Sequence, residues 1–303
     1  MKAEAQNLNQ GKRVLFISSY SYGWDTVQTQ IEGIKAGVDE NTTIDYEFMD
    51  TKRFRTDEWL NMFHDMLKYH LENTDPYDVV IVGDDAALQF AMEYREELFP
   101  EIPVVFEGVN DEEYAMKAAE SPLVTGIIEK LSVEKNIDMA LKVNPTADKV
   151  VAILDDSVTA DAERKNFYSA EAEYPELEFS EINSSELTTA QLQQVISKVD
   201  DKTILIYIVM SKDGSGKQYT SDQAVRMVVN YSKVPVYRMV EAGIGDGLLG
   251  GNVVSMYKSG EIAAQMAMDI ANGTDSAEIN VVKDSPNIYC VDEDVMRKFG
   301  LEA

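Results

Sequence analysis

Short apolar runs alternate with helix-like patterns along the first third of the chain. The run at 13–17 (RVLFI) predicts a buried strand, and Val27, Ile31, Ile34 and Val38 then recur at helical spacing. The same alternation continues, with strands expected at 44–49, 78–82 and 104–106 and helices at 60–71 and 86–98. Residues 111–122 form a looser segment that ends this first series.

The alternation restarts after that segment. We expect helices at 133–141, 162–174, 187–199 and 221–231, and strands at 149–154, 177–182, 203–209 and 234–237. A glycine-rich stretch, 243–252, leads to a strand at 253–255 and a helix at 261–271, which suggests that the chain returns to the first series. The pattern predicts an α/β protein with two parallel sheets, each covered by helices on both faces.

The restart predicts two lobes, which suits a chain of 303 residues because one hydrophobic core rarely spans so many. We expect one lobe from 11–123 with 248–278, and the other from 124–247 with 279–303. Crossings near Thr125, Gly247 and Ser285 are expected to act as a hinge, since lobe closure needs a few residues to absorb the rotation.

Charge and composition exclude several classes of function. The chain has 54 acidic and 27 basic residues, and the resulting net charge of −27 would repel nucleic acids and anionic membrane surfaces. A single cysteine, Cys290, allows no internal disulfide, and two histidines leave little for a metal centre or a catalytic triad. We expect neither a cofactor nor a metal. Residues 1–10 are polar and show no secretion signal.

The strand assignments also indicate which loops to inspect. Ligands of open parallel sheets bind beyond the carboxyl ends of the strands. Those loops are 18–25, 83–87, 107–111, 155–159, 210–219 and 239–243. They combine small hydroxyls, carboxylates and aromatic rings, a composition that favours a small-molecule cleft over a packing turn.

Some residues of these loops allow two interpretations. Tyr20, Tyr22 and Trp24 lie within five residues on a loop, where simultaneous burial is difficult, so we expect at least one of them to form a stacking wall for a ligand. Asp84 and Asp85 precede a helix, where an acid can cap the helix or can face a ligand ammonium. The pair Asp155–Asp156 allows the same alternatives, and the spacing of these acids matches no recognised metal motif.

Catalytic motifs are missing from the sequence. The segment 212–217 (KDGSGK) lacks the spacing of a phosphate-binding loop, and no serine nucleophile elbow, metalloprotease helix or kinase motif occurs. We therefore do not expect an enzyme, although scattered carboxylates leave that alternative open.

The order of several stretches carries a family resemblance. They are VLFISSYSYGWDT, YEFMDTKRF, YDVVIVGDDAALQFAMEYREELFPEIPVVFEGVND, TGIIE, KVPVY, GLLGGNVVS and SPNIYCVDEDVMRKFGL. Together they resemble the extracytoplasmic substrate-binding-like domains of type I periplasmic binding protein fold in bacterial sensor histidine kinases and related signalling proteins. The same family includes the binding proteins of ABC transporters.

The resemblance implies two doubly wound lobes joined by a hinge and closing on a small solute. First-lobe contacts are implied for Tyr20, Trp24, Asp84, Asp85, Glu107 and Asn110. Second-lobe contacts are implied for Asp156, Ser157, Ser211, Asp213 and Glu241. The loop after Asp156 departs from the pattern, because it lacks the glycine expected near the start of the helix.

Two functions follow from this family and a third remains open. The first is an extracytoplasmic, membrane-tethered sensor domain that closes on a solute and signals to a membrane-spanning kinase or similar module. The alternative is the solute-binding protein of an ABC transporter, with a permease as its partner and an amino acid or related small molecule as its ligand. The third is an enzyme, because a doubly wound fold does not decide function.

The loops also indicate a class of ligand. They hold aromatic rings and many carboxylates, and the nearest cationic side chains in them are Lys212 and Lys217. An ammonium-bearing or neutral polar solute is therefore expected rather than a polyanion. An amino acid or amine would place its cation on Asp84, Asp85 or Glu107, and any carboxylate on serine hydroxyls and helix N-terminal N–H groups.

Overall fold

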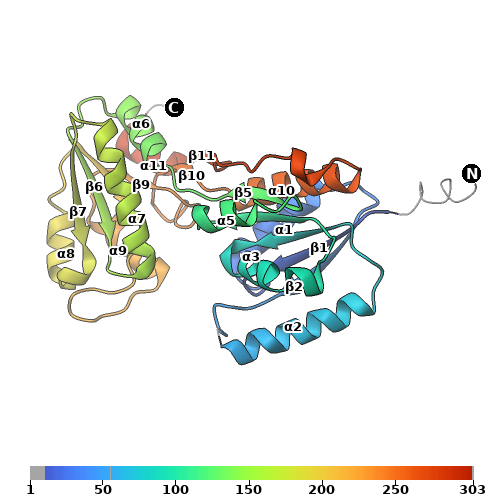
Figure 1. Cartoon of the computed structure of the whole chain (residues 1–303). Coiled ribbons are helices and arrows are strands. Elements are labelled where there is room, and N and C mark those ends of the chain that lie inside the picture. Colours follow the sequence, from blue (N-terminus) through green and yellow to red (C-terminus); the bar gives the residue numbers. More distant parts are fainter. Residues whose placement is uncertain (1–10, 55, 302–303) are drawn as a thin grey trace, which may run out of the picture. The chain divides into compact units, whose positions relative to one another are not determined.

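A computed structural model describes residues 11–54 and 56–301 (Figure 1). The chain divides into two compact units, which are described separately. Unit 1 comprises residues 11–130 and 256–286, and unit 2 comprises 131–255 and 287–301. Residues 1–10, in which no secretion signal was expected, lie outside the described residues. Within the described residues, every helix is too short or too polar to cross a membrane.

Unit 1 is built on a five-stranded, wholly parallel sheet of order β2-β1-β3-β4-β5. Its strands are β1 (Arg13–Ser18), β2 (Thr43–Phe48), β3 (Val79–Gly83), β4 (Val104–Val109) and β5 (Val124–Ile128). Its helices are α1 (Asp25–Gly37), α2 (Asp57–Glu72), α3 (Asp84–Glu93), α4 (Arg95–Leu98), α5 (Glu112–Ala118) and α10 (Met256–Ala271), with a 3₁₀ turn η4 (Ser276–Glu278).

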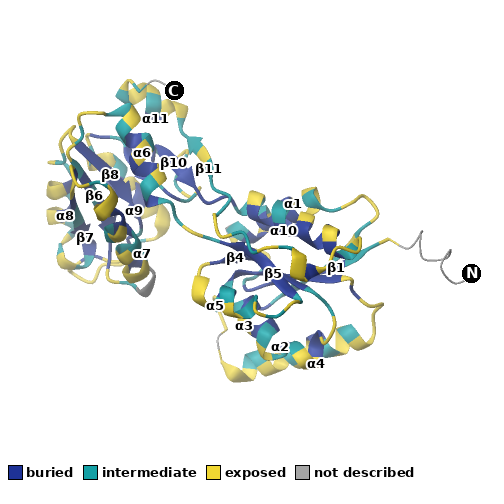
Figure 2. Cartoon of the chain, turned by 45° about the horizontal axis from the view of Figure 1, so that its top comes forward, coloured by how far each residue is buried: buried dark blue, intermediate teal, exposed yellow. Residues whose placement is uncertain are grey.

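Both faces of this sheet are covered because alternate strand residues point to opposite sides. Leu15, Val80 and Phe106 pack beneath α2, α3 and α5 on one face. On the other face, Val14 and Val105 pack against α1 and α10. Figure 2 shows the consequence, with buried strands at the centre of the unit and exposed outer faces on its helices.

Unit 2 holds a six-stranded sheet of order β11-β10-β9-β8-β6-β7. Its strands are β6 (Lys149–Leu154), β7 (Glu178–Asn183), β8 (Thr203–Tyr207), β9 (Val236–Arg238), β10 (Gly250–Val253) and β11 (Ile288–Val291). Its helices are α6 (Val133–Val143), α7 (Val158–Ser169), α8 (Thr189–Ile196), α9 (Ser221–Tyr231) and α11 (Glu293–Phe299), with 3₁₀ turns η2 (Ala170–Glu173) and η3 (Ser184–Glu186). Helices α6, α7 and α11 cover one face, and α8 and α9 cover the other.

Two α/β units with parallel sheets confirm the predicted fold class. One strand departs from the predicted pattern, because β11 pairs with β10 in the antiparallel direction. No strand was expected at 288–291, where the segment IYCV is short and only partly buried. The strand exists because β10 offers it an unpaired edge.

The structure places the borders of the units away from the predicted ones. Residues 124–130 belong to unit 1, since β5 pairs with β4, and residues 248–255 belong to unit 2, since β10 pairs with β9. Residues 279–286 also belong to unit 1, where Val282 bridges to Ile127 of β5. The chain therefore crosses between units at 130/131, 255/256 and 286/287, instead of near Thr125, Gly247 and Ser285.

Candidate functional site

The loops predicted to form a site in unit 1 meet at the carboxyl edge of its sheet. Ser19, directly after β1, holds them together: its hydroxyl donates to the Gly83 carbonyl (2.8 Å) and accepts from the Ala87 N–H (2.8 Å). The Thr51 hydroxyl, from the loop after β2, donates to the Ser19 carbonyl (2.7 Å). The ends of β1, β2 and β3 are thus tied into one surface.

Two aspartates at this edge adopt the left-handed backbone conformation. Asp50 has φ 55° and Asp84 has φ 70°, and among the described residues no other non-glycine residue has positive φ. Such conformations cost of order 1–3 kcal/mol and cluster at functional sites, where the surrounding structure holds them. Their position at one sheet edge supports a binding site there.

An aromatic pair with a cation forms the outer part of this edge. The Tyr20 and Trp24 rings lie 5.9 Å apart between centroids, and the Lys52 ammonium lies 4.3 Å from the Tyr20 centroid and 5.0 Å from that of Trp24. Trp24 is 42% exposed, so its ring is open to solvent. We expected Lys212 and Lys217 to be the nearest cations to the candidate loops. That expectation is wrong, because Lys52 lies directly over two of the loop's aromatic rings.

A pocket of about 350 Å³ lies at this edge, with Tyr20 in its lining. It is lined by Tyr20, Met49, Thr51, Lys52, Leu60, Asp85, Ala86, Gln89, Phe90 and Glu93. The lining combines an aromatic and aliphatic wall with an ammonium and carboxylates. Such a mixture suits a small solute that carries both apolar surface and charge.

Asp85 is held in place within this pocket. Its carboxylate accepts from the backbone N–H groups of Asp111 (3.0 Å) and Asn110 (3.4 Å), which follow β4. The Asn110 side chain donates to Glu129 (3.0 Å), which follows β5. A carboxylate has about four lone-pair positions, so Asp85 keeps acceptor capacity for a ligand.

Glu107 and Asp84 were predicted to face a ligand, but the structure buries both side chains. Glu107 is 0% exposed and Asp84 is 7% exposed. Burial raises the pKa of Asp84 to about 7, and burial beside Asp84 raises the pKa of Glu107 well above its ordinary value. Neither side chain lies at the surface. Glu107 lies on β4 at the sheet face that α1 and α10 cover, and Asp84 accepts from Gln30 of α1 (3.2 Å).

The carboxyl edge of unit 2 is organised by Asp155, which was not among the expected contacts. Its carboxylate accepts from the Ser211 N–H (2.7 Å), the Ser211 hydroxyl (2.5 Å) and the Ser157 N–H (2.9 Å). These hydrogen bonds hold the pKa of Asp155 below its ordinary value despite burial. Asp155 therefore positions Ser157 and Ser211, both of which were predicted to contact a ligand.

The remaining predicted residues of unit 2 fall into two groups. Asp156 and Glu241 are exposed, although the Asp156 carboxylate already accepts from Asn183 (2.8 Å) and lies 3.4 Å from the Arg164 guanidinium. The Ser157 hydroxyl accepts from the Ala160 N–H (3.2 Å) and so caps α7. The sequence prediction did not include Arg164, a second cation at this edge.

Asp213 is enclosed by hydrogen bonds from its own loop and from the first residue of α8. It is 2% exposed and accepts from the hydroxyls of Thr189 (2.6 Å), Ser215 (2.6 Å) and Tyr219 (3.0 Å). The backbone N–H groups of Ser215 (3.0 Å) and Lys217 (3.1 Å) donate to it as well. Its carboxylate holds the loop closed and does not present a free oxygen at the surface.

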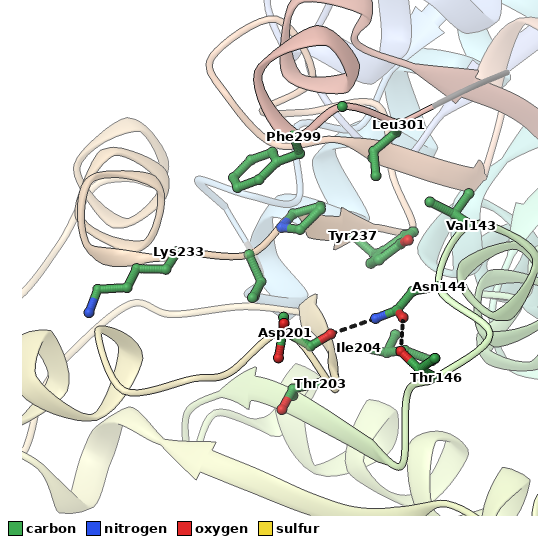
Figure 3. A pocket seen from close by; sticks show the side chains of 13 residues that line it. Val143, Asn144, Thr146, Asp201, Thr203, Ile204, Lys233, Tyr237, Phe299 and Leu301 are labelled. Carbon is green, nitrogen blue, oxygen red and sulfur yellow. Dashed lines mark hydrogen bonds between the residues drawn. The ribbon is translucent and has the colours of Figure 1, made fainter.

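A second pocket, of about 370 Å³, lies in unit 2 near the chain's described end (Figure 3). Tyr237, Phe299 and Leu301 line one side, and Asn144 donates to the Asp201 carbonyl (2.6 Å) on the other. Thr203 begins β8, so this pocket lies at the amino edge of the sheet. Parallel α/β sheets bind ligands at the opposite edge, and this pocket is not the predicted site.

No group of three or more His, Cys, Asp or Glu within 11–54 and 56–301 is arranged to hold a metal ion. The geometry at the sheet edges is that of a small-solute site. A family model described as ABC transporter substrate binding protein matches residues 24–302. The chain belongs to this family.

Similarity to known proteins is consistent with this family assignment. A tyrosine-binding protein of Clostridioides difficile is 22% identical over 207 residues, which cover 67% of this chain and 58% of that protein. Among solved structures, the ligand-free, open form of a substrate binding protein with adhesive properties from Clostridium difficile has a TM-score of 0.71 at 17% identity, covering 96% of each chain. A domain from Streptococcus pneumoniae in complex with L-Trp has a TM-score of 0.61 at 16% identity, covering 96% of this chain and 95% of that one.

These likenesses confirm the type I periplasmic binding protein fold. The family is one of solute-binding proteins. They give no support to the sensor-kinase interpretation, which was the first expectation, and they fit the alternative of a transporter binding protein better.

Proposed function

We propose that this protein is the extracytoplasmic solute-binding component of an ABC importer and that its ligand is an amino acid with an aromatic side chain. The observation that carries this proposal is the unit 1 pocket, in which Tyr20, Lys52 and Asp85 line the same cavity. An ammonium group would pair with Asp85, a carboxylate with Lys52, and a ring would stack on Tyr20. A free amino acid carries these three features together. The tyrosine-binding relative and the L-Trp complex support the same ligand class.

Titration calorimetry with L-tyrosine and L-tryptophan tests the ligand class. We expect binding to the unaltered protein, and Asp85→Asn to weaken it roughly 10- to 100-fold, because a hydrogen bond to a charged group contributes about 1.5–3 kcal/mol. Tyr20→Ala should weaken it by a similar factor through the loss of stacking. Tyr69→Ala is the matched control, since Tyr69 is 65% exposed on α2 and is not part of the pocket lining. Binding of a polyol such as myo-inositol without binding of either amino acid would refute the ligand class.

Unit 2 is proposed to complete the site through Ser157, Ser211, Asp156 and Glu241, and the units are proposed to close on the ligand. The chain crosses between them at 130/131, 255/256 and 286/287, and these three short crossings are the candidates for a hinge. We expect X-ray scattering to give a smaller radius of gyration when the protein is saturated with L-tryptophan. Identical profiles with and without a bound ligand would contradict closure.

A further inference from the structure

The interior of unit 1 contains a fully buried glutamate, Glu107. Glu107 lies on β4, two residues after Val105, and therefore points to the same sheet face, toward α1 and α10. It is 0% exposed, and neither carboxyl oxygen has a hydrogen-bond partner of good geometry, although Gln30 and Ser259 adjoin it. An ionised carboxylate without donors is very costly in such a place, whereas a protonated one is tolerated.

A second buried acid and an amide adjoin Glu107. Gln30 of α1 donates from Nε2 to Asp84 (3.2 Å), and its own Oε1 is buried without a partner. The Glu107 carboxyl group packs closely against the backbone of Gly83, where a Cβ atom would lie 3.0 Å from Glu107 Oε1. The cluster thus holds more buried oxygen acceptors than donors, and protons on the carboxyl groups would supply the missing donors.

The charged and titratable groups around the pair come from every neighbouring element. They are Tyr20 after β1, Lys52 after β2, Asp85 of α3 and Glu129 after β5, while α1 and α10 contribute the neutral Gln30 and Ser259. Lys52 is the cation of this set, and it acts on Asp84. Asp84 also influences the Tyr20 hydroxyl, so the pair is linked to the wall of the proposed binding pocket.

We propose that Asp84 and Glu107 form a buried proton-binding pair whose ionisation strengthens amino-acid binding at Asp85 and Tyr20. The effect on affinity rests on the proposed function. Burial and the neighbouring Asp84 raise the pKa of Glu107 well above its ordinary value, which favours its protonated form. Asp84 is the member that ionises, because Gln30 donates to it and Lys52 attracts it. Burial raises the pKa of Asp84 to about 7, which places this step in the physiological range.

The direction of coupling follows from charge. A ligand ammonium bound at Asp85 favours an ionised neighbour, so binding releases a proton from Asp84 and affinity rises with pH. One linked proton limits the rise to tenfold per pH unit. The carboxyl and amino groups of L-tryptophan do not titrate between pH 5.5 and 8, so the rise reports on the protein.

Calorimetry with L-tryptophan from pH 5.5 to 8 tests this coupling. Affinity should increase several-fold in the unaltered protein and stay constant in Asp84→Asn. Asparagine suits the test because it has nearly the same shape and tolerates the φ of 70° at this position. Glu96→Gln, at an exposed acid of α4, should keep the unaltered profile. A pH-dependent rise that persists in Asp84→Asn would overturn the proposal.

Thermal unfolding without ligand separates this proposal from the proposed function. A raised carboxyl pKa in the folded state stabilises the protein below the ordinary pKa, and this contribution disappears as pH rises through about 7. The melting temperature of Asp84→Asn should therefore increase relative to the unaltered protein between pH 5 and pH 8. A constant difference would refute the proton-binding pair, whereas failure of L-tyrosine and L-tryptophan to bind would refute only the ligand class.

Discussion

Replacing Gly33 with alanine is expected to destabilise unit 1 by about 3 kcal/mol or more, because two helix backbones touch at this position. A Cβ atom on Gly33 of α1 would lie 2.0 Å from the Tyr257 carbonyl oxygen of α10. Gly37 meets the Glu261 carbonyl at 2.4 Å in the same way, and Gly260 meets the Gln30 carbonyl at 2.4 Å. Figure 1 shows α1 and α10 side by side.

The helices must separate to admit the methyl group, because a main-chain carbonyl within a helix cannot rotate away. Separation weakens contacts along the whole α1–α10 interface, including Ile31 and Ala263 of the buried cluster. The loss exceeds the roughly 1 kcal/mol that alanine gains over glycine in a helix. Gln30 lies on the same helix, so its hydrogen bond to Asp84 would be disturbed as well.

Urea unfolding, followed by hydrogen exchange of α1 and α10 amides, measures this effect. Gly23→Ala is the matched control, since nothing lies within 4 Å of a Cβ atom there and its φ is not in the positive range that favours glycine. We expect Gly23→Ala to unfold at nearly the same urea concentration as the unaltered protein. Equal midpoints for both variants would show that the helices have room to adjust.

Local sequence patterns were sufficient to predict the strands that lie at the centre of each sheet. DVVIV and the run at 203–209 are apolar on both faces, and such runs occur where helices cover a parallel sheet on both sides. Strands β10 and β11 were harder to predict. Gly250–Val253 begins with two glycines and resembles a turn, and its strand pairing comes from β9 and β11, which are separated from it in sequence.

For the candidate site, too, contacts between residues that are distant in sequence could not be predicted from local patterns. The rule that ligands bind at the carboxyl edge correctly directs attention to the loops after β1, β3 and β4, which the structure brings together through Ser19 and Asp85. Sequence could not show that Glu107 is buried, since that depends on α10, about 150 residues later. It also could not show that Lys52 lies over the Tyr20 and Trp24 rings, because that contact depends on how two loops fold.

Asp213→Ala is expected to destabilise unit 2 by about 3 kcal/mol, because it leaves five donors around a buried carboxylate without an acceptor. The bonds from Ser215 and Lys217 N–H groups matter most, since backbone donors cannot turn toward another partner. Asp213→Asn should cost less: the Thr189 and Tyr219 hydroxyls can rotate and accept from the new amide. We therefore expect Asp213→Ala to lower the stability of unit 2 more than Asp213→Asn does.

The pH dependence of this loop has the opposite sign to that of the Asp84–Glu107 pair. Hydrogen bonds to the ionised carboxylate hold the pKa of Asp213 well below its ordinary value. Such a group stabilises the folded state above its unfolded pKa of about 3.9, and the contribution is lost as pH falls through the folded pKa. The loop should therefore stay closed throughout the neutral and mildly acidic range.

Hydrogen exchange and thermal unfolding of Asp213→Ala, together with its ligand affinity, decide between two roles for Asp213. If it anchors the loop, the amides of Ser215 and Lys217 exchange faster in Asp213→Ala and the melting temperature falls. If it contacts a ligand, as the sequence suggested, affinity falls while stability and exchange stay unchanged. Glu176→Ala is the control, because Glu176 is an exposed acid of the same unit outside the proposed site and should leave both the melting temperature and the affinity unaltered. The structure favours the anchor, since a carboxylate that already accepts five hydrogen bonds has little acceptor capacity left for a ligand.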